Sequence, residues 1–583
     1  MILFIASWNA GPGARAATRD VLAQCGSLFP PLEGRNVHQT GWDGPTHVAW
    51  VGGYPVGGAV LRTRQSISIV EGVALSDGPT VLTPENLLDR GRPGSRPGSE
   101  RLPADIDGQF AIVQGSRDRL DIATDDLGMY RVYWCRHNGA WYVANRVELL
   151  ARLLGKSQMD LEGAAGLLSV GWVARDHTLL EGIEVVPGGA RWCWSSDKGP
   201  SIERPPYMSR LAHQPRRPVD IPELADSLVT RCEAVSKWAG ELEAPLTAGL
   251  DSRLILCCLR AGEVPARYVT QGDESHPDVL AARRLAGLTG VEHRVFAPWE
   301  LGQDSGVAVS ELARQVVAQN DGMVSLWQVL DLMRPAPVGN LCLWGIGGEI
   351  GRAFYTRAEE FISRRSEVSL ERFVNGRAGD ANGLLTRDGA AMGRMQVKGF
   401  VEEARDSGFD PLDARDAFYA FERVGRWAAA NVRKAVPAAL FAPLSVRPFV
   451  DAAFSLSPIE RYSEALHFRL MQFLSPELRS FPVPGQSWRS QRRYLNLVGA
   501  GIGRLRRDSG PDGSSCPRIQ LLDHLVSDMT ARSMDHQGSA VWSIVDRSRF
   551  ESLVRADPAE RARSAGSLFG VLTLLGYEEF RSS

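Results

Sequence analysis

The sequence predicts two domains of different fold class: an α+β domain with antiparallel sheets over residues 1–205, and an α/β domain with a parallel sheet over residues 220–583. The chain of 583 residues is longer than the roughly 250–300 residues that one hydrophobic core holds. Before residue 200, short runs rich in β-branched and aromatic residues follow one another closely between Gly, Asp and Asn turns. After residue 222, short apolar strands alternate with segments of helical period, which is typical of a parallel sheet.

The amino-terminal region reads as a series of short strands. Met1–Trp8 is apolar and carries no basic segment, so we expect a first strand there and no signal peptide. Arg90–Pro103, rich in Gly, Pro, Arg and Ser, predicts a surface loop, and the prolines of residues 198–220 predict the domain boundary. The other strands predicted here are Phe110–Val113, Leu120–Ala123, Arg131–Trp134 and Trp141–Ala144.

The carboxyl-terminal region alternates strands with helices. The predicted strand–helix pairs are Ala244–Thr247 with Ser252–Arg260 and Arg267–Thr270 with Asp278–Ala286, and two further strands are His293–Phe296 and Leu341–Trp344. Residues 410–480 and 519–577 have helical patterning, and residues 500–517 have the composition of a mobile segment. Parallel folds bind ligands at the carboxyl ends of their strands, so the loops there are the candidate sites.

Bulk composition excludes several classes of function. A net charge of -2 gives no support for a nucleic-acid partner, and no apolar run reaches the ~18–20 residues that cross a bilayer. The 8 cysteines contain no CxxC pair, which argues against zinc sites and a secreted disulfide framework. We therefore expect a cytoplasmic protein without nucleic-acid or membrane partners, and the sequence leaves a homodimer open.

The loop Thr247–Ser252 carries the main candidate site. It lies between a strand and a helix, where backbone N–H groups and a helix N-terminus favour an anion such as pyrophosphate. Gly249 permits a conformation closed to other residues, and Thr247 and Ser252 offer hydroxyl donors. Asp251 is an anion itself, so its natural role is to hold a Mg²⁺ ion that bridges phosphate oxygens.

This loop resembles the Ser-Gly-Gly-x-Asp-Ser pyrophosphatase loop of the asparagine synthetase family, with Thr247 and Ala248 as departures. Arg267–Gly272 is similar to the family's adenine strand, and Gly345–Glu349 to its Gly-x-Gly-x-Asp-Glu turn, with Glu349 in the slot of the second metal ligand. The resemblance implies a PP-loop ATP-pyrophosphatase (HUP-like) domain that uses ATP and Mg²⁺. It places Mg²⁺ on Asp251 and Glu349, and ATP on Leu246, Thr247, Ala248, Gly249, Asp251, Ser252, Val269, Gly345 and Gly347.

The amino-terminal region resembles the class II glutamine amidotransferase (Ntn) domain, an antiparallel β-sandwich. The landmarks are Asp107–Ala111, Asp125–Gly128, Tyr142–Asn145, Thr178–Ile183 and Pro187–Gly189. A working glutaminase of that class needs an N-terminal cysteine, whose thiol attacks and whose α-amino group is the base. This chain begins Met1-Ile2 and its first cysteine is Cys25, so we expect a degenerate domain without glutamine hydrolysis.

Loss of glutaminase activity is a trait of β-lactam synthetases and lasso-peptide cyclases, which adenylate a carboxylate with ATP and let a substrate amine attack it. The resemblance therefore implies an AMP-forming amide ligase in a natural-product pathway, acting on a small molecule or peptide with a carboxylate and an amine. A lasso-type macrolactam cyclase and a degenerate nucleotide- or partner-binding scaffold are the alternatives. An RNA-modifying relative is disfavoured by the charge and by the cysteine layout.

The general base for the amine is left open by the sequence. β-Lactam synthetases carry a tyrosine in the glycine-rich turn, paired with a glutamate, and Ile346 stands at that position here. The candidates for catalytic roles are Glu349, Tyr355, Glu422 and His467. On a predicted helix, Tyr419, Glu422 and Arg426 share one face. The family's adenylate-binding lysine has no clean counterpart, and Arg489 or Arg492 offers a positive charge instead.

Overall fold

The structure is a computed structural model, and we use amino half for residues 2–202 and carboxyl half for residues 207–582. Two antiparallel sheets lie in the amino half and a parallel sheet lies in the carboxyl half, as predicted. The domain boundaries at 205 and 220 stay predictions. The structure describes residues 2–27, 32–53, 56, 58–89, 102, 105–155, 158–202, 207–296, 317, 319–329, 340–361, 366–380, 382–432, 439–482, 488–489, 531 and 535–582.

The amino half stacks two six-stranded antiparallel sheets. The first has the order β10-β8-β9-β1-β3-β2 and the second β12-β11-β7-β6-β5-β4. Strands of the first sheet are β1 (Ile2–Trp8), β2 (Val37–Gln39), β3 (Thr46–Gly52), β8 (Tyr133–His137), β9 (Ala140–Ala144) and β10 (Glu184–Val185). Strands of the second are β4 (Gly58–Arg62), β5 (Ser66–Leu75), β6 (Asp107–Ser116), β7 (Arg119–Thr124), β11 (Arg191–Ser195) and β12 (Gly199–Ser201).

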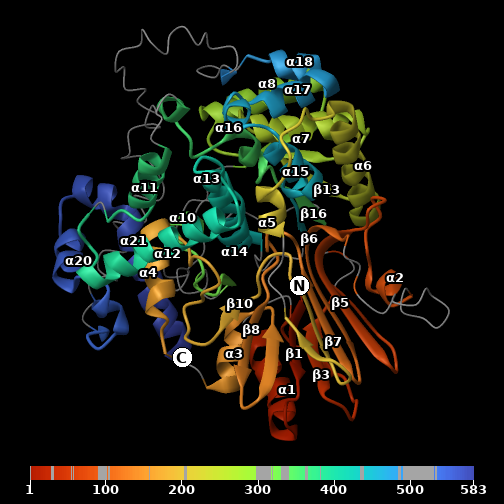
Figure 1. Ribbon diagram of the computed structural model, residues 1–583, viewed down its shortest axis with the longest axis vertical. Coiled ribbons are helices and arrows are strands. Elements are labelled where there is room, and N and C mark those ends of the chain that lie inside the picture. The colour runs from red at the N-terminus through yellow and green to blue at the C-terminus, as the bar shows by residue number, and fades with distance from the viewer. Residues whose placement is uncertain are drawn as a thin grey trace.

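Tryptophans hold the two antiparallel sheets together. The Trp134 ring on β8 stacks on Trp141 of β9 and meets Trp192 of β11 edge-on, with centroids 5.4 Å apart in both pairs. Such large rings bury much apolar area and interlock between the two inner faces. Helices α1 (Pro12–Ser27) and α3 (Val147–Leu154) pack on the strands of the first sheet. The amino half is therefore a layered sandwich, and its main core is continuous with that of the carboxyl half (Figure 1).

The carboxyl half is organised by a five-stranded sheet in which every pair of neighbours is parallel. Its order is β15-β14-β13-β16-β17, so the chain moves outward from β13 to one edge and then crosses to the other side of β13. The strands are β13 (Leu242–Pro245), β14 (Arg267–Gln271), β15 (His293–Phe296), β16 (Leu341–Leu343) and β17 (Ala439–Phe441). The topological switch point lies between β13 and β16, where open parallel sheets bind ligands.

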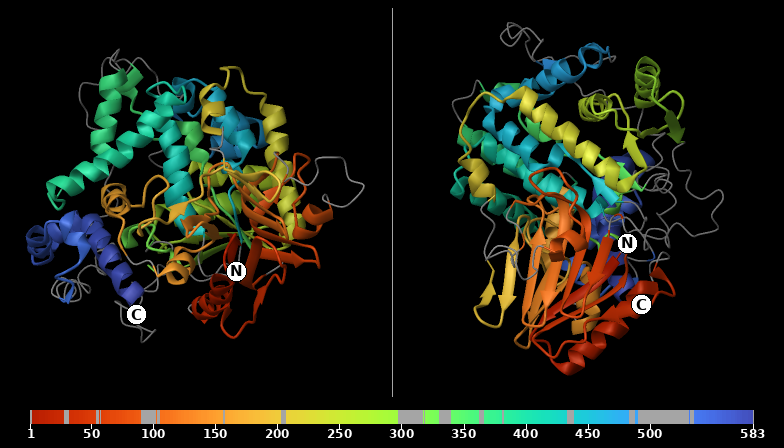
Figure 2. Two further views of the ribbon diagram at one scale, coloured as in Figure 1. Left: turned by 60° about the horizontal axis from the view of Figure 1, so that its bottom comes forward. Right: turned by 90° about the vertical axis from the view of Figure 1, so that its right-hand side faces the viewer.

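Helices cover this sheet and extend away from it (Figures 1 and 2). Helix α6 (Ile221–Ala239) packs on α7 (Leu250–Ala261), and α8 (Pro277–Thr289) packs on β14 and β15. Among the described residues, none of the helices combines the length and the apolar content that crossing a membrane needs. Other helices are α2 (Pro84–Asp89), α4 (Leu161–Val170), α5 (Tyr207–Ala212), α10 (Leu326–Val329), α11 (Ser366–Arg377), α12 (Arg387–Asp406), α13 (Asp413–Ala417), α14 (Ala429–Val432), α15 (Arg447–Ser455), α16 (Pro458–Tyr462), α17 (Ala465–Leu474), α18 (Pro476–Ser480), α20 (Arg547–Val554) and α21 (Pro558–Ser582).

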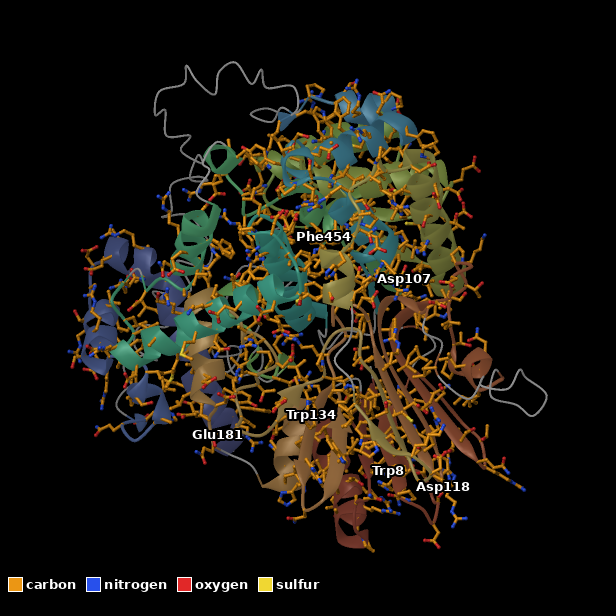
Figure 3. All side chains as sticks on the ribbon, in the orientation of Figure 1. Trp8, Asp107, Asp118, Trp134, Glu181 and Phe454 are labelled. Carbon is orange, nitrogen blue, oxygen red and sulfur yellow. The ribbon has the colours of Figure 1, made fainter. Side chains whose placement is uncertain are left out.

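The two halves meet where β6 faces β17. The amide of Gln109 accepts from the backbone N–H of Ala442 at 2.8 Å and donates to the carbonyl of the same residue at 3.2 Å. Asp107, labelled in Figure 3, accepts from Arg231 Nε at 3.1 Å and from the backbone N–H of Arg447 at 2.9 Å. The Asp107–Ala111 landmark of the sequence thus forms the junction between the halves.

Two sequence predictions need correction, and three predicted segments lie wholly or in part outside the described residues. Strand β8 begins at Tyr133, two residues later than predicted, and the side chain of Arg131, just before it, is buried and donates to the carbonyl of Arg426. The predicted helical stretch 410–480 contains a strand, β17, which is three residues long. The predicted surface loop, apart from Leu102, and the predicted mobile segment 500–517 lie outside the described residues, as do residues 519–530.

Candidate active site

The Thr247–Ser252 loop connects β13 to α7 at the switch point of the parallel sheet. Its N–H groups bond to side chains in this structure. The N–H of Thr247 donates to Ser252 Oγ at 3.2 Å, and that of Gly249 donates to Thr247 Oγ1 at 3.1 Å. The N–H of Ala248 donates to Asp278 Oδ1 at 2.9 Å, from the first turn of α8. The loop is thus held by hydroxyl and carboxylate groups of the protein itself.

Glycine at position 249 has a reason other than the predicted one. Its φ is −64°, so it does not use the left-handed region. A Cβ there would lie 3.1 Å from Thr247 Oγ1, which is tight contact, so the missing side chain makes room for that hydroxyl. As the N-cap residue of α7, Gly249 provides no side-chain cap, which leaves the start of the helix open to a ligand. Ala248 is outside the positive-φ region, as its replacement of glycine requires.

Asp251 lies in the first turn of α7 and is bound at both carboxylate oxygens. His467 Nε2 lies 2.8 Å from Oδ1, and Arg352 Nη1 donates to Oδ2 at 3.0 Å. Burial by itself raises the pKa of Asp251, but the Arg352 guanidinium and His467 outweigh it and lower the pKa below its usual value. Asp251 is therefore an anion held in a fixed orientation.

The glycine-rich turn after β16 closes around Asp251. A Cβ on Gly348 would lie 2.3 Å from Asp251 Oδ1, and a Cβ on Gly345 would lie 3.2 Å from Asp251 Cβ. Gly347 has φ +95°, and a Cβ there would meet Ser445 Oγ at 2.2 Å. The glycines predicted as part of the ATP site thus let two loops from neighbouring strands touch.

Glu349 follows that turn and faces a tyrosine. Its Oε2 accepts from the hydroxyl of Tyr419, a fully buried residue of the π-helix η5 (Phe418–Ala428). Burial and then the negative charge of Asp251 raise the pKa of Glu349, against a lowering by Tyr419. Burial and then Glu349 hold the pKa of Tyr419 well above its usual value, so this hydroxyl stays protonated and donates. The pKa of Asp251 is therefore lowered and that of Glu349 raised, although the two carboxylates interact electrostatically.

His467 and Tyr355, two other candidates for catalytic roles, differ in their distance from this centre. His467 is fully buried on α17 and contacts Asp251 directly. Tyr355 packs against Tyr419, with ring centroids 5.8 Å apart, and Arg377 lies over its ring at 5.0 Å. Burial raises the pKa of Tyr355, so its hydroxyl stays protonated beside the Glu349–Tyr419 pair. Both residues belong to the site, Tyr355 at its aromatic wall.

Glu422 turns away from the site. Its carboxylate accepts from Trp172 Nε1 at 3.1 Å and from the backbone N–H of Arg175 at 3.0 Å, both in the amino half. The expectation that Tyr419 and Glu422 share a helical face is wrong, because a π-helix makes i to i+5 bonds and turns these residues to different sides. Glu422 and Arg426 both face the amino half, where Arg426 pairs with Asp176 at 2.5 Å. Glu422 thus joins the halves, and Tyr419 takes the place beside Glu349.

Leu246 and Val269, both predicted to contact ATP, are hydrogen-bonded to each other through their backbones. Both side chains are buried in the core, and the N–H of Leu246 donates to the carbonyl of Val269 at 2.9 Å. Thr270 Oγ1 donates to the carbonyl of Leu246 at 2.5 Å and lies 2.8 Å from His293 Nε2. This pairing fixes the ends of β13 and β14 beside each other, where the adenine was predicted to lie.

The sequence did not predict Arg352 at this site, and it marked Tyr419 only as a neighbour of Glu422 on a predicted helix. Arg352 follows Glu349 by three residues, which places it in the same short 3-10 helix η3 (Gly348–Arg352), a spacing that could have suggested it. Arg489, predicted as a source of positive charge, donates from Nη1 to the carbonyl of Arg352 at 3.1 Å. Its Nε lies 3.4 Å from Glu464, so it supports Arg352 and its charge is compensated. Arg492 lies outside the described residues.

In the amino half, Ile2 is a buried hydrocarbon side chain on β1. Cys25 is buried on α1, and burial, followed by the charge of Glu148, raises the pKa of its thiol to about 12. A thiol with so high a pKa is not a nucleophile near neutrality.

Comparisons with known proteins give distant structural likeness alone. No protein-family model and no curated protein matches the chain. The allosteric regulatory enzyme of purine biosynthesis aligns at 9% identity and TM-score 0.24, over 54% of this chain and 87% of that chain. The glutamine phosphoribosylpyrophosphate amidotransferase from B. subtilis, complexed with ADP and GMP, aligns at 12% identity and TM-score 0.23, over 60% of this chain and 77% of that chain. TM-scores this low carry no argument about fold, family or function.

Proposed function

We propose that the protein is an ATP-dependent ligase that adenylates a substrate carboxylate, releases pyrophosphate, and passes the acyl group to an amine. One observation carries the proposal. The Asp251 carboxylate, in the first turn of α7, is seated in the Gly345–Gly348 turn of the neighbouring strand. This contact occurs at the switch point of a parallel sheet, which is where nucleotides bind in such folds. The resemblance to the asparagine synthetase family supports the same reaction.

The nucleotide end of the proposed site is the Thr247–Ser252 loop. The hydroxyls of Thr247 and Ser252, 3.0 Å apart, and the open N-terminus of α7 would hold the pyrophosphate part of ATP. The adenine would lie at the end of β14, near the backbone of Val269. The close approach of Gly345 to Asp251 would keep the second turn against the phosphates.

Mg²⁺ fits the Asp251 carboxylate of this site. Among the described residues, no group of three or more His, Cys, Asp or Glu side chains forms a self-sufficient metal site. Mg²⁺ in ATP-using enzymes needs only one or two carboxylates together with phosphate oxygens. Each oxygen of Asp251 accepts one hydrogen bond, which leaves a lone pair on each for the ion, whereas Glu349 is proposed for proton transfer and not as a ligand. Bound there, the ion would neutralise charge that develops on pyrophosphate.

The amine end of the proposed site is the Glu349–Tyr419 pair. A carboxylate with a raised pKa is suited to take a proton from an attacking amine. Tyr419 keeps that carboxylate oriented by donating its hydroxyl proton to it. The pair supplies the tyrosine and glutamate that β-lactam synthetases combine, from different positions, because Ile346 stands where the sequence predicted the tyrosine. We therefore assign Asp251 the role of binding Mg²⁺ and Glu349 the role of accepting the proton from the amine.

The amine is proposed to come from the substrate and not from glutamine, and the buried, high-pKa thiol of Cys25 supports this because it is not a nucleophile near neutrality. A natural-product substrate, small or peptidic, fits this reading, and a lasso-type macrolactam is the narrower alternative. A neighbouring gene for a short precursor peptide would favour the lasso substrate.

A nucleotide-binding scaffold without turnover is the second candidate function. Two observations favour it. Arg352 donates a hydrogen bond to Oδ2 of Asp251. The backbone N–H groups of Thr247, Ala248 and Gly249 donate to groups of the protein itself. A scaffold of this kind binds ATP and produces no pyrophosphate.

Exchange of labelled pyrophosphate into ATP tests the proposed function. We expect exchange that requires Mg²⁺ and a carboxylic acid from a panel of amino acids, N-acyl amino acids and aryl acids. The amide of each active acid serves as the control and should support none. Turnover should release AMP. Release of ADP with phosphate, or exchange that ignores the acid, would contradict the proposal.

A further inference from the structure

Arg423, in the π-helix η5, has its guanidinium held by aromatic rings. Its Cζ lies 3.7 Å from the ring centroid of Trp427 and 5.6 Å from that of Trp172. The side chain is half-buried. Stacking between two indoles fixes the plane of a guanidinium while leaving its N–H edge available.

Arg423 forms no hydrogen bond and no ion pair with any residue that the structure describes, and stacking is its full set of short contacts. Neighbouring arginines differ: Arg352 is paired with Asp251, and Arg426 with Asp176. A guanidinium carries five N–H donors, and leaving them unpaired in a half-buried place is costly. The arrangement is that of a binding group whose acceptor comes from outside the protein.

The place of Arg423 is the Glu349 end of the site. The indole of Trp344, which directly precedes the Gly345 turn, lies 6.1 Å from the Trp427 ring on which Arg423 stacks. Charge agrees with this place, since Arg423 lowers the pKa values of Glu349, Tyr355 and Tyr419. A ligand at Arg423 would therefore lie between tryptophan rings and the proposed proton acceptor.

We propose that Arg423 binds a carboxylate of the acyl donor, so that the enzyme selects acids with an apolar or planar group beside that carboxylate. The identity of the ligand as acyl donor rests on the proposed function, whereas a carboxylate site at Arg423 does not. Arginine and carboxylate form two parallel charge-assisted hydrogen bonds, a match that fixes orientation as well as affinity. Trp344 and Trp427 provide the apolar surface for the rest of the acid.

Direct binding, without ATP, tests the carboxylate site. The probes are phenylacetate, with one carboxylate, phenylsuccinate, with two, and phenylacetamide as the neutral control. Tryptophan emission reports binding because Trp427 touches the guanidinium, and Trp427→Phe should remove most of the signal. In Arg423→Gln we expect affinity for the acids to fall by about tenfold or more, since a hydrogen bond to a charged group contributes about that much. Arg423→Lys keeps the charge without the bidentate geometry and should recover part of it.

Arg372→Gln is the matched control, because Arg372 is exposed on α11. It should bind the acids as the native protein does, and ATP affinity and melting temperature should be unchanged in Arg423→Gln. If Arg423→Gln loses binding of phenylacetate, Arg423 binds the reactive carboxylate of the acid. If it loses binding of phenylsuccinate alone, Arg423 binds a second carboxylate of the acid.

The proposal is overturned if the native protein binds phenylacetamide as well as phenylacetate, or if Arg423→Gln binds both acids like the native protein. It is also overturned if Arg423→Gln weakens the binding of inorganic phosphate or ATP and leaves the binding of both acids unchanged. Absence of ATP binding in the native protein, with acid binding at Arg423 intact, would count against the proposed function and for the carboxylate site.

Discussion

The two carboxylates of the site, Asp251 and Glu349, sit at neighbouring strand ends and differ in almost every respect. Asp251 is bound by Arg352 and His467, which lower its pKa. Glu349 has a neutral partner, Tyr419, and burial together with the charge of Asp251 raises its pKa. One carboxylate is thus fixed as an anion, and the other is placed to exchange a proton.

This difference gives roles to residues of the same chemistry. Pairs of titratable groups whose surroundings push their pKa values apart mark the division of labour in many active sites. Here the division follows the fold, because Asp251 is at the end of β13 and Glu349 is at the end of β16. In the proposed reaction, the phosphates would lie at the first strand end and the amine at the second.

The largest expected effect separates the two half-reactions. Asp251→Asn should reduce pyrophosphate exchange by about 100- to 1,000-fold, because it removes the anion at the phosphate end. Glu349→Gln should keep exchange within about tenfold and lose amide formation by about 100-fold, since loss of a general base costs that much. Hydroxylamine, a weakly basic amine that needs no such base, should still trap the acyl-adenylate in Glu349→Gln.

Asp226→Asn is the control for the first of these, because Asp226 is an exposed carboxylate on α6. It should behave like the native protein. Equal loss of exchange in Asp251→Asn and Glu349→Gln would break the comparison, because the two carboxylates would then serve one step.

An intermediate effect is expected from the turn that holds Asp251. In Gly348→Ala the new methyl would lie 2.3 Å from Asp251 Oδ1, so the carboxylate must move. We expect exchange to fall by about tenfold or more and unfolding free energy to fall by about 1–3 kcal/mol, as overpacking does. Gly376→Ala, on α11 with open space around it, should stabilise the protein slightly. Normal exchange in Gly348→Ala would show that Asp251 does not need its present position.

A smaller effect concerns the pH at which amide formation begins. Glu349 must be ionised to accept a proton, so the rate should rise with pH through its pKa. Tyr419→Phe removes a hydrogen bond that lowers this pKa, so the rising limb should move to higher pH with a modest loss of maximal rate. Asp251→Asn removes a negative charge that raises the pKa, so its residual activity should move to lower pH. Unchanged limbs in both variants would remove Glu349 from the proton transfer.

The smallest effect is on stability against pH. The pKa of Asp251 is lowered by folding, so its contribution is present above its unfolded value and is lost as pH falls through the folded one. The pKa of Glu349 is raised, so its contribution is present below its unfolded value and is lost as pH rises through the folded one. Urea unfolding between about pH 3 and about pH 7 should therefore show opposite trends for Asp251→Asn and Glu349→Gln, each relative to the native protein. Parallel trends would contradict the opposite shifts.

The sequence predicted the loops at the strand ends of this site better than the side chains that contact Asp251 and Glu349. Asp251 was predicted from the glycine-containing loop that follows an apolar strand, and Glu349 from the resemblance of its turn to a family motif; the topology places the two loops at adjacent parallel strand ends. Strands β6, β7, β9, β14 and β15 were likewise marked by local patterns. Local pattern is sufficient where the signal lies within a few residues.

Partners from distant segments were beyond that reach. Nothing in the sequence near Tyr419 indicates a π-helix, and an ordinary helical period puts Tyr419 and Glu422 on one face when they point to opposite sides. His467 was named as a candidate, but its contact with Asp251 joins residues 216 positions apart. The conformation of Gly249 was predicted wrongly because close approach of the Thr247 hydroxyl, and not backbone strain, explains the missing side chain.

Calorimetric titration of ATP, with and without Mg²⁺, tests most directly whether Asp251 marks the phosphate end of a nucleotide site. The account predicts that the native protein and Glu349→Gln bind ATP more tightly with Mg²⁺, and that Asp251→Asn loses this dependence on the ion. Binding of ATP to Asp251→Asn with the full Mg²⁺ effect, or no binding to the native protein, would contradict it.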